Sequence, residues 1–496
     1  MRKGFSLRRK IMIYTLVGWM AFSTTLTGCA KDKETGTTAG TAASTAAANA
    51  EVKYSIESIR NEVVGIDQPI TLADGTTRAQ INFDNAATTP ALKAVQNAVN
   101  EELNMYGSIG RGYSQKSDHS SQLVEETREK VLKFVGADNG DYTCVFTNST
   151  TDGLNKLASA VIKDKKDIVL TTRMEHHANL LPWRERASVV YADCDEKGRL
   201  KYEDIEAQLK SNKVKFVTVT AASNVTGYVN DVHRIAKLAH QYGAKIIVDG
   251  AQIVAHREFS MVGATPEENI DFLAFSAHKM YSPYGGGALI GLTEVMNENM
   301  PQFYGGGTVH IVADDWQSYK NAPASYEAGS PNYPGIVGLG KAIEILQEVG
   351  FDKIQAHEKE LNAKLVEGLK KFDNITIYGD SENLDDRVGV VSFNFKDINS
   401  HYMAEQLKEV GGVATRRGSF CAHPYVWRLM HIPNDSLGAY EGCEGAFVPG
   451  MIRISFGIYN TPEEIDEFLA VVPDSKKKAE KAVSEAETSK PIDPEF

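Results

Sequence analysis

The stretch that decides the fold begins at residues 245–252, with the sequence KIIVDGAQ, and ends at residues 271–279, with the sequence DFLAFSAHK. Its runs Lys245–Asp249 and Asp271–Phe275 are short and apolar, which is typical of buried parallel strands. Similar runs, rich in Val, Ile, Phe and Thr, are Tyr142–Thr147, Asp167–Thr172, Val189–Ala192, Lys215–Thr220 and Gly287–Gly291. Segments with helical spacing separate these runs, so the sequence predicts an α/β fold.

The pattern changes after Pro334, where long amphipathic helical segments such as Phe351–Phe372 replace the alternation of strands and helices. Two further strand-like runs follow, Val388–Phe395 and Met451–Phe456, and they predict a second, smaller α+β domain. The domains that we expect are an N-terminal segment packing on the small domain (52–79), a large domain (80–335), a small domain (336–473) and a charged, frayed or partly helical tail (474–496).

Length, charge and cysteine content exclude several classes of protein. The chain has 496 residues and a net charge of −12, and an acidic balance argues against nucleic acid as the main partner. Hydrophobic residues make up 42%, which excludes a mainly disordered or multi-pass membrane protein. Five cysteines without a CxxC pair do not make a disulfide scaffold, and we expect no metal site.

The N-terminus has the pattern of an export signal. A basic start is followed by the apolar run Ile11–Phe22, whose length suits a signal-peptide core better than a membrane span. The run Leu26-Thr27-Gly28-Cys29 resembles the bacterial lipobox, and an ordinary signal peptide is the alternative. We expect a signal peptide over 1–28, lipidation of Cys29 and a flexible tether over 29–51. The protein would then be exported and lipid-anchored at the outer face of the bacterial cell membrane, or at the outer membrane of a Gram-negative cell.

Two residues at the ends of predicted strands could carry chemistry. Lys279 directly follows one strand and precedes a Gly-rich turn, and a partly desolvated lysine has a lowered pKa and can form a Schiff base. Asp249 stands at the carboxyl end of another strand, where ligands bind in open α/β sheets. It could pair with the protonated ring nitrogen of pyridoxal phosphate. A surface lysine in a turn and a helix N-cap are the ordinary alternatives.

Two other strand ends carry polar motifs. Thr147–Asp152 lies between a predicted strand and a helix, where backbone N–H groups and hydroxyls could bind an anion or simply form a capping box. Glu175–Asn179 closes another strand–loop unit, and an imidazole there could stack on a flat cofactor ring. Paired histidines more often have no role or bind metal adventitiously.

Together these segments resemble the class V aminotransferase family, and most closely its Suf-type cysteine desulfurases and selenocysteine lyases. The resemblance covers about three quarters of the chain, and its further motifs are Asn82–Pro90, Ser223–Gly227, Tyr326–Asn332 and Arg453–Thr461. It implies a fold-type I transferase dependent on pyridoxal 5'-phosphate (PLP). Such a protein has a large, mostly parallel seven-stranded sheet domain and a smaller C-terminal α+β domain.

The resemblance also implies which residues bind the cofactor. Lys279 looks like the lysine that holds PLP covalently and then shuttles protons. Asp249 would contact the ring nitrogen and Gln252 the phenolic oxygen. His176 would stack on the ring as a catalytic residue, and Asn224 would lie near the phenolate side. The residues that would hold the phosphate are Thr150, Thr151, Ser276 and His278.

On the substrate side, Arg453 is similar to the arginine that binds the α-carboxylate of an amino acid, and Arg416 is a second candidate for substrate binding. Cys421 stands at the position of the desulfurase nucleophile, whose thiolate takes sulfur from a cysteine-like substrate and leaves alanine. Gly305–Thr308 resembles the loop that reaches the partner subunit's site, which implies a homodimer.

Three departures from the Suf pattern lie on the substrate side. Ser419 and Phe420 stand before the nucleophile, where that group typically has two histidines. Gly110 stands where a site-facing histidine is expected, and Tyr425–Gly450 looks like an altered lid.

Three functions remain open from the sequence. The first is removal of sulfur or selenium from cysteine-like substrates, with a persulfide on Cys421 and an unidentified sulfur acceptor. The second is another class V reaction at an α-carbon, such as amino transfer, epimerisation or elimination. The third is a non-catalytic binding lipoprotein. Outside the cell a free thiol can oxidise, and Cys421 and Cys443 are the cysteines best suited to pair. Whether they bridge stays open, because the sequence does not give the distance between them.

Overall fold

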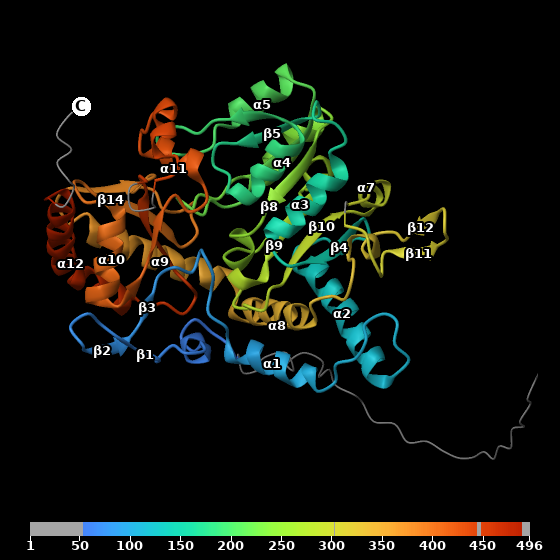
Figure 1. The fold of residues 1–496 in the computed structure, drawn as a ribbon, viewed down its shortest axis with the longest axis horizontal. Helices are drawn as coiled ribbons and strands as arrows, with labels where there is room; N and C mark the ends of the chain where they lie inside the picture. Colours follow the sequence, from blue (N-terminus) through green and yellow to red (C-terminus); the bar gives the residue numbers. More distant parts are fainter. Residues whose placement is uncertain (1–52, 302, 444–447, 489–496) are drawn as a thin grey trace, which may run out of the picture. The chain divides into compact units, whose positions relative to one another are not determined.

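A computed structural model describes residues 53–301, 303–443 and 448–488, so the predicted signal peptide, Cys29 and the tether lie outside it. The centre of the described chain is a seven-stranded sheet (Figure 1). In spatial order its strands are β4 (Tyr142–Thr147), β10 (Gly287–Leu292), β9 (Phe272–Ser276), β8 (Lys245–Asp249), β7 (Val214–Thr220), β5 (Ile168–Thr172) and β6 (Ser188–Ala192). All seven predicted strands are present, within one residue of their predicted ends, and the α/β prediction is confirmed.

The direction of the strands places the chemistry at one edge of the sheet. Strands β9, β8, β7, β5 and β6 are parallel, whereas β10 is antiparallel to both β4 and β9. Strand β4 therefore points the same way as β9, because two reversals cancel. The carboxyl ends of β4, β5, β7, β8 and β9 consequently lie along the same edge.

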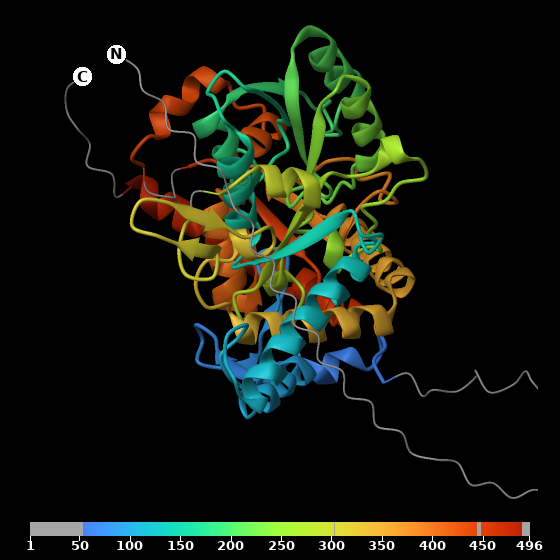
Figure 2. The same ribbon diagram turned by 90° about the vertical axis from the view of Figure 1, so that its right-hand side faces the viewer.

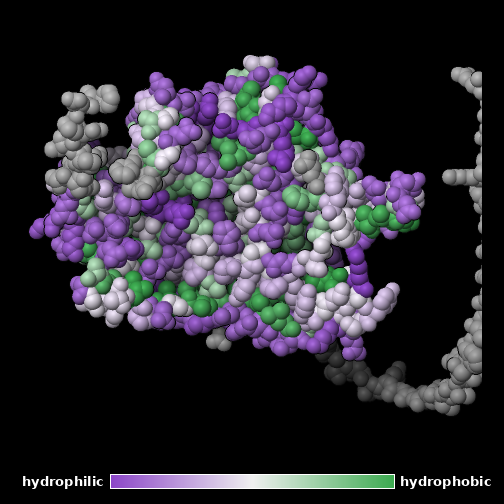
Figure 3. Space-filling view, in the orientation of Figure 1, coloured by the Kyte–Doolittle hydropathy of each residue, from purple (hydrophilic) through white to green (hydrophobic). Residues whose placement is uncertain are grey.

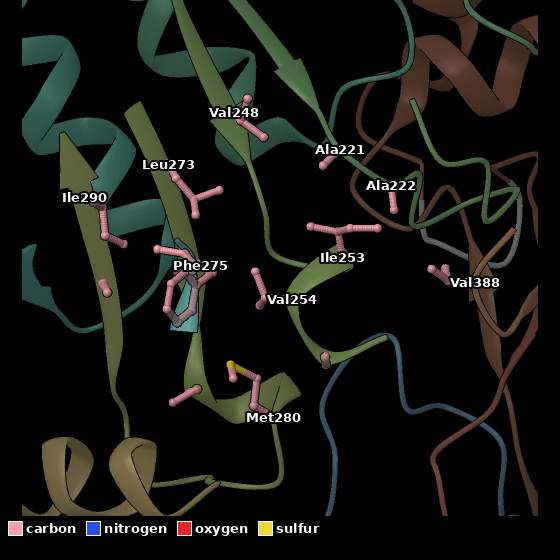
Figure 4. Packing of buried hydrophobic residues seen from close by; sticks show 14 of the residues in the cluster. Ala221, Ala222, Val248, Ile253, Val254, Leu273, Phe275, Met280, Ile290 and Val388 are labelled. Atoms are coloured by element: carbon pink, nitrogen blue, oxygen red, sulfur yellow. The ribbon is translucent and has the colours of Figure 1, made fainter. Parts of the chain in front are cut away.

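Helices cover both faces of this sheet. Neighbouring residues of a strand face opposite sides, so Phe275 and Ile290 join one apolar cluster while Ala274 and Leu289 join another. Figure 4 shows part of the first cluster, with Phe275 and Met280 close to the loop of Val254. That face is covered by α2 (Gln115–Phe134), α5 (Tyr202–Ser211), α6 (Val232–Gln241) and α8 (Tyr333–Val349), and the other by α3 (Thr150–Val161), α4 (Leu181–Arg186) and α7 (Thr293–Glu298). Each large apolar side chain buried in this way stabilises the fold by about 1.5–3 kcal/mol.

The C-terminal region forms its own antiparallel sheet, in the order β13 (Ile375–Tyr378), β14 (Val390–Phe395), β17 (Met451–Ser455) and β16 (Arg416–Gly418). Around this sheet lie α9 (Phe351–Leu369), α10 (Ser400–Gly411), α11 (His423–Leu429) and α12 (Pro462–Thr488). Strands β14 and β17 were predicted, and β13 and β16 are too short to stand out in the sequence. The region is α+β, as expected.

The structure has two features close to the domain limits that we expect near residues 80 and 474. The limits themselves stay predictions. Helix α12 continues through residue 474 to Thr488, so the first part of the expected tail is helical and buries Ser475 and Ala479. Near the other end of the chain, β1 (Pro69–Thr71) pairs with β2 (Thr77–Ala79), and β3 (Ile81–Asn82) pairs in parallel with β15 (Val413–Ala414). The N-terminal segment itself contacts the C-terminal region through the Ala73 N–H, which donates to the Glu409 carbonyl at 3.1 Å.

Two helices and a hairpin complete the fold. Helix α1 (Lys93–Leu103) and α2 pack against α8, as both views of the ribbon show (Figures 1 and 2). Helix α8 begins close to residue 336, where we expected the small domain to start. It nevertheless packs on α1 and α2, which belong to the first half of the chain. The hairpin of β11 (Val309–Val312) and β12 (Gln317–Tyr319) projects from the body of the molecule (Figure 1).

Candidate active site

A cavity of about 190 Å³, which we call the central cavity, lies at the carboxyl edge of the seven-stranded sheet. This is the edge at which ligands bind in open α/β sheets. Its walls come from residues that follow β4, β5, β7, β8 and β9 and from the C-terminal region. All the residues predicted to contact cofactor or substrate line it, namely Thr150, Thr151, His176, Asn224, Asp249, Gln252, Ser276, His278, Lys279, Arg416, Cys421 and Arg453.

Lys279 lies in the turn of Ala277–Lys279 that directly follows β9. Burial lowers the pKa of Lys279 to about 8, with the Asp249 carboxylate opposing this change and Arg453 adding to it. The amine makes no hydrogen bond or ion pair with any described residue. The lowered pKa and the place of Lys279 in the central cavity fit a desolvated lysine better than a solvated surface lysine in a turn.

Asp249 and Gln252 form the end of the central cavity that follows β8. Asp249 is 3% exposed, and burial raises the pKa of its carboxyl group. Its Oδ1 accepts the N–H of Ala251 at 2.9 Å, so it also stabilises the turn after the strand. Gln252 donates from Nε2 to the Ala86 carbonyl at 2.9 Å, while its buried Oε1 has no partner among the described residues. The two side chains therefore leave polar atoms available to a ligand.

The start of α3 lies beside the strand end that carries Ser276. Ser149 caps the helix by accepting the N–H of Asp152, and the Asp152 carboxylate accepts the N–H of Asn148, the residue before the cap. The start of the helix is therefore capped, in a variant of the expected capping box. Thr150 also contacts Ser276 twice. The backbone N–H of Thr150 donates to the Ser276 hydroxyl at 2.7 Å, and the two side-chain hydroxyl oxygens lie 2.7 Å apart. The capping and anion-binding interpretations are thus compatible, because the cap leaves the hydroxyls of this cluster in the central cavity.

Two histidines of the central cavity are uncharged at neutral pH. Burial lowers the pKa of His176 to about 3, with the positive charge of Lys279 adding to the decrease. Its Nδ1 accepts the N–H of Ala178 at 3.0 Å, so the ring proton lies on Nε2. Burial likewise lowers the pKa of His278 to about 4. A neutral imidazole fits stacking on a flat ring.

Arg453 lies on β17 and is 2% exposed. It donates from Nη1 to the Asn224 carbonyl at 3.0 Å and from Nη2 to the Asp84 carboxylate at 2.9 Å, whereas its Nε has no partner among the described residues. Burial lowers the pKa of Arg453 to about 10, and Asp84 opposes this change. Arg416 lies 3.7 Å from the second oxygen of Asp84. Sequence reasoning gave Asp84 no role, although it stands inside the quoted motif Asn82–Pro90.

Cys421 is an exposed residue at the rim of the central cavity. Phe420 and Cys421 have φ angles of 50° and 56°, a left-handed conformation that is uncommon for residues other than glycine. The loop is held by two bonds, from the Asn224 amide to the Phe420 carbonyl at 2.8 Å and from the His177 N–H to the Cys421 carbonyl at 2.7 Å. These contacts fix the backbone that carries the thiol.

The substrate-side departures have structural consequences. Phe420, at one of the two positions where the resemblance predicts a histidine, is buried with its ring 4.9 Å from the Arg453 guanidinium carbon. Gly110 lines a separate cavity of about 870 Å³ and takes no part in the central one. Cys421 and Cys443 are both free, exposed thiols, so the structure has no bridge between them.

The expectation that Tyr425–Gly450 is an altered lid on the substrate side stays a prediction. None of its described residues, 425–443 and 448–450, lines the central cavity. Tyr425 is buried and donates to the Gly198 carbonyl at 2.6 Å, which draws the segment toward the loop after β6. The segment instead lines a different pocket, described below.

Comparison with known proteins gives a consistent result. The family model described as aminotransferase class-V matches residues 81–468. A cysteine desulfurase of Haloferax volcanii is 35% identical over 408 residues, covering 80% of this chain and 90% of that protein. A probable cysteine desulfurase of Staphylococcus aureus is 33% identical over 437 residues, covering 86% and 98%.

Solved structures agree with the sequence comparisons. The apo structure of a cysteine desulfurase from Thermococcus onnurineus has a TM-score of 0.74 at 30% identity, covering 85% of this chain and 98% of that one. The cysteine desulfurase CsdA of Escherichia coli, in an S-sulfonic acid form, has a TM-score of 0.70 at 26% identity, covering 86% and 99%.

Proposed function

The chain belongs to the class V aminotransferase family as a cysteine desulfurase-like enzyme, and from this we propose that it removes sulfur or selenium from cysteine-like amino acids. The observation that carries the proposal is the composition of the central cavity. A nucleophile (Cys421), an amine with a lowered pKa (Lys279) and a buried guanidinium (Arg453) line the same 190 Å³ space. Removal of sulfur from an amino acid requires a thiol that accepts the sulfur, an amine that holds the cofactor and a group that binds the substrate carboxylate.

Membership of the family implies PLP, and the residues of the central cavity fit it. Lys279 has a free amine, Asp249 is a buried acid, and Gln252 has a buried oxygen without a partner. We assign Asp249 to the ring nitrogen, Gln252 and Asn224 to the phenolic side and His176 to the ring face. The phosphate would be held by Thr150, Thr151, Ser276 and His278. When bound, PLP supplies an electron sink for a bond broken at the substrate α-carbon.

The protein's own residues then have distinct tasks. Arg453 orients the substrate by its α-carboxylate, which must share the guanidinium with Asp84. Lys279, with a pKa of about 8, exchanges protons near neutral pH and can move one at the α-carbon. The Cys421 thiolate attacks the substrate sulfur, and the carbon–sulfur bond breaks with its electron pair passing to carbon. A proton then completes alanine, and Cys421 carries the sulfur as a persulfide.

The test uses the purified, PLP-loaded protein with L-cysteine, and it measures alanine together with sulfide released by a reductant. We expect equimolar products, loss of both in Cys421→Ser, and no loss in Cys443→Ser, a matched control at the other exposed thiol. Absence of alanine from the PLP-loaded wild-type protein would reject the proposal. Activity that survives in Cys421→Ser would instead indicate another class V reaction.

We also propose that the protein acts as a homodimer. The projecting hairpin of β11 and β12 carries Ile311, Val312 and Trp316, which are 56%, 66% and 52% exposed. Figure 3 shows hydrophobic side chains gathered on this hairpin. Exposed apolar groups of this kind mark interaction surfaces. The hairpin continues from Gly305–Thr308, the loop whose sequence resembles the one that reaches a partner subunit.

Our proposal for location rests on the sequence of the N-terminus alone. We propose export, cleavage before Cys29 and lipid anchoring at that cysteine. Metabolic labelling with a fatty acid should mark the wild-type protein and leave Cys29→Ala unlabelled, and equal labelling of both would overturn the proposal. Among the described residues, no helix is long and apolar enough to cross a membrane.

A further inference from the structure

A second pocket lies between the turn after β5, α4 and the segment that follows Cys421. We call it the arginine pocket, because Arg173, Arg184 and Arg428 line it, and its volume is about 610 Å³. Tyr191 and Trp427 contribute aromatic walls. It shares no lining residue with the central cavity, so it is a separate site. Part of its wall comes from the described residues of the segment that the sequence suggested as a lid.

The charge of this pocket is strongly positive. Arg173 and Arg184 form no ion pair with any described residue. Arg428 lies 3.6 Å from the carboxylate of Asp193, and the charge of that carboxylate also acts on Arg173. The Nε of Arg173 is buried without a hydrogen-bond partner among the described residues. Burial lowers the pKa of Arg173, and the positive charge of Arg428 adds to the decrease. Three positively charged guanidinium groups face one half-exposed carboxylate. The pocket therefore has an excess of positive charge that a bound anion could neutralise.

Contacts with neighbouring groups hold two of the three arginine side chains of the pocket in place. The Arg173 guanidinium lies 3.7 Å from the centre of the Tyr191 ring, which fixes its plane. Arg428 donates to the Pro424 carbonyl at 3.0 Å and is thereby held against α11. A guanidinium fixed in this way loses less freedom when it binds a carboxylate or a phosphate.

A pair of neutral histidines separates this pocket from Cys421. His423 Nδ1 lies 3.0 Å from His177 Nε2, and the two rings stack with centres 4.8 Å apart. Burial lowers the pKa of His177 to about 4 and also lowers that of His423. The positive charge of the pocket therefore comes from its arginines at neutral pH. His177 also lines a further cavity, which Cys421 lines as well.

We propose that the arginine pocket binds a small organic anion bearing two or more carboxylate or phosphate groups. Its volume falls within the range of about 300–1,000 Å³ that is usual for small-molecule sites. The anionic groups would contact Arg173, Arg184 and Arg428, and the apolar part would pack against Trp427 and Leu437. This site is additional to the carboxylate site at Arg453 and goes beyond the proposed function.

The test is calorimetric titration of the PLP-loaded full-length protein with citrate, a probe with three carboxylates, at constant ionic strength. We expect binding to the wild-type protein and affinity at least about tenfold lower in the double variant Arg173→Gln, Arg428→Gln, because charge-assisted hydrogen bonds are lost. Arg234→Gln is a matched control, since Arg234 stacks on Tyr202 at 4.4 Å outside the pocket, and it should leave the affinity unchanged.

Two further variants make every outcome decisive. Arg453→Gln should keep citrate binding, and its loss there would assign the anion to the central cavity and overturn the proposal. Arg184→Gln changes an exposed residue and tests the pocket again if the double variant fails to fold. No binding to the wild-type protein, or equal affinity in the pocket variants, would also overturn it. Because binding is measured directly, these results do not depend on the desulfurase reaction.

Discussion

Lys279 is the residue whose environment sets the pH range of the site. Its folded pKa of about 8 lies well below the ordinary lysine value of 10.5 because burial disfavours the charged ammonium. Only the neutral amine can react with an aldehyde. The fraction of neutral amine therefore rises as the pH passes through about 8.

The first prediction follows from this pKa. The rate at which cofactor-free protein binds PLP covalently should increase from about pH 6.5 to about pH 8.5 and level off above about pH 9. Stopped-flow absorbance of the bound cofactor measures this rate, and Lys279→Ala should show no covalent phase. A rate that climbs steadily to pH 10.5 would mean that the amine keeps its ordinary pKa.

The second prediction concerns Asp84, the partner of a buried arginine. In Asp84→Asn the Arg453 guanidinium loses its ion pair while it stays buried. We expect the free energy of unfolding to fall by about 1–3 kcal/mol, less than for a fully buried pair because Asp84 is partly exposed.

Urea unfolding of Asp84→Asn measures this loss. Asp466→Asn is the matched control, because its ion pair with Lys364 is exposed and should contribute less than about 1 kcal/mol. Equal effects in both variants would show that Asp84 does not stabilise the Arg453 charge.

At the scale of elements, the site forms because the carboxyl ends of neighbouring strands lie side by side at one edge of the main sheet. Strands β7, β8 and β9 pair in register, with Thr220 opposite Asp249 and Asp249 opposite Ala274. Residues a few positions after each strand must therefore converge. Asp249 and Lys279 each end or follow an apolar run in the sequence. Their positions alone were therefore enough to predict that they share a site.

Helix α12 gives the third prediction. The middle of this helix buries Ser475 and Ala479, and Lys476 lies 5.6 Å from the centre of the Phe395 ring. Deleting residues 475–496 should lower the free energy of unfolding by about 1–3 kcal/mol, because buried surface of α10 and β14 becomes exposed. Deleting only residues 489–496 is the control and should have no effect. Chemical unfolding compares the two, and identical stabilities would show that the tail contributes nothing after residue 474.

At the scale of the whole molecule, the exposed hairpin β11–β12 gives the fourth prediction. Replacing Ile311 and Val312 with lysine should prevent dimer formation, because two buried charges without partners cost several kcal/mol. Light scattering after size-exclusion chromatography gives the mass of wild type and variant. A double replacement at Val64 and Val262, also exposed but outside the hairpin, is the control and should stay dimeric. A monomeric wild-type protein would refute the dimer itself.

The sequence by itself determined the features that depend on neighbouring residues. The seven strands of the main sheet were predictable because each is a run of apolar β-formers. Asp249 and Lys279 were predictable because each ends or closely follows such a run, whereas Ser276 came from the family resemblance. The family motifs added Arg453 and Cys421 to the same site. Local patterns suffice where a side chain is positioned by its own strand.

Only the tertiary structure decided the features that join distant segments. The pairing of Asp84 with Arg453, the packing of Phe420 on that arginine and the route of the segment after Cys421 depend on contacts between residues far apart in the chain. The arginine pocket likewise combines Arg173 with Arg428, which are separated by the length of several elements. Spacing along a chain carries no information on such contacts, because they follow from how whole elements pack against one another.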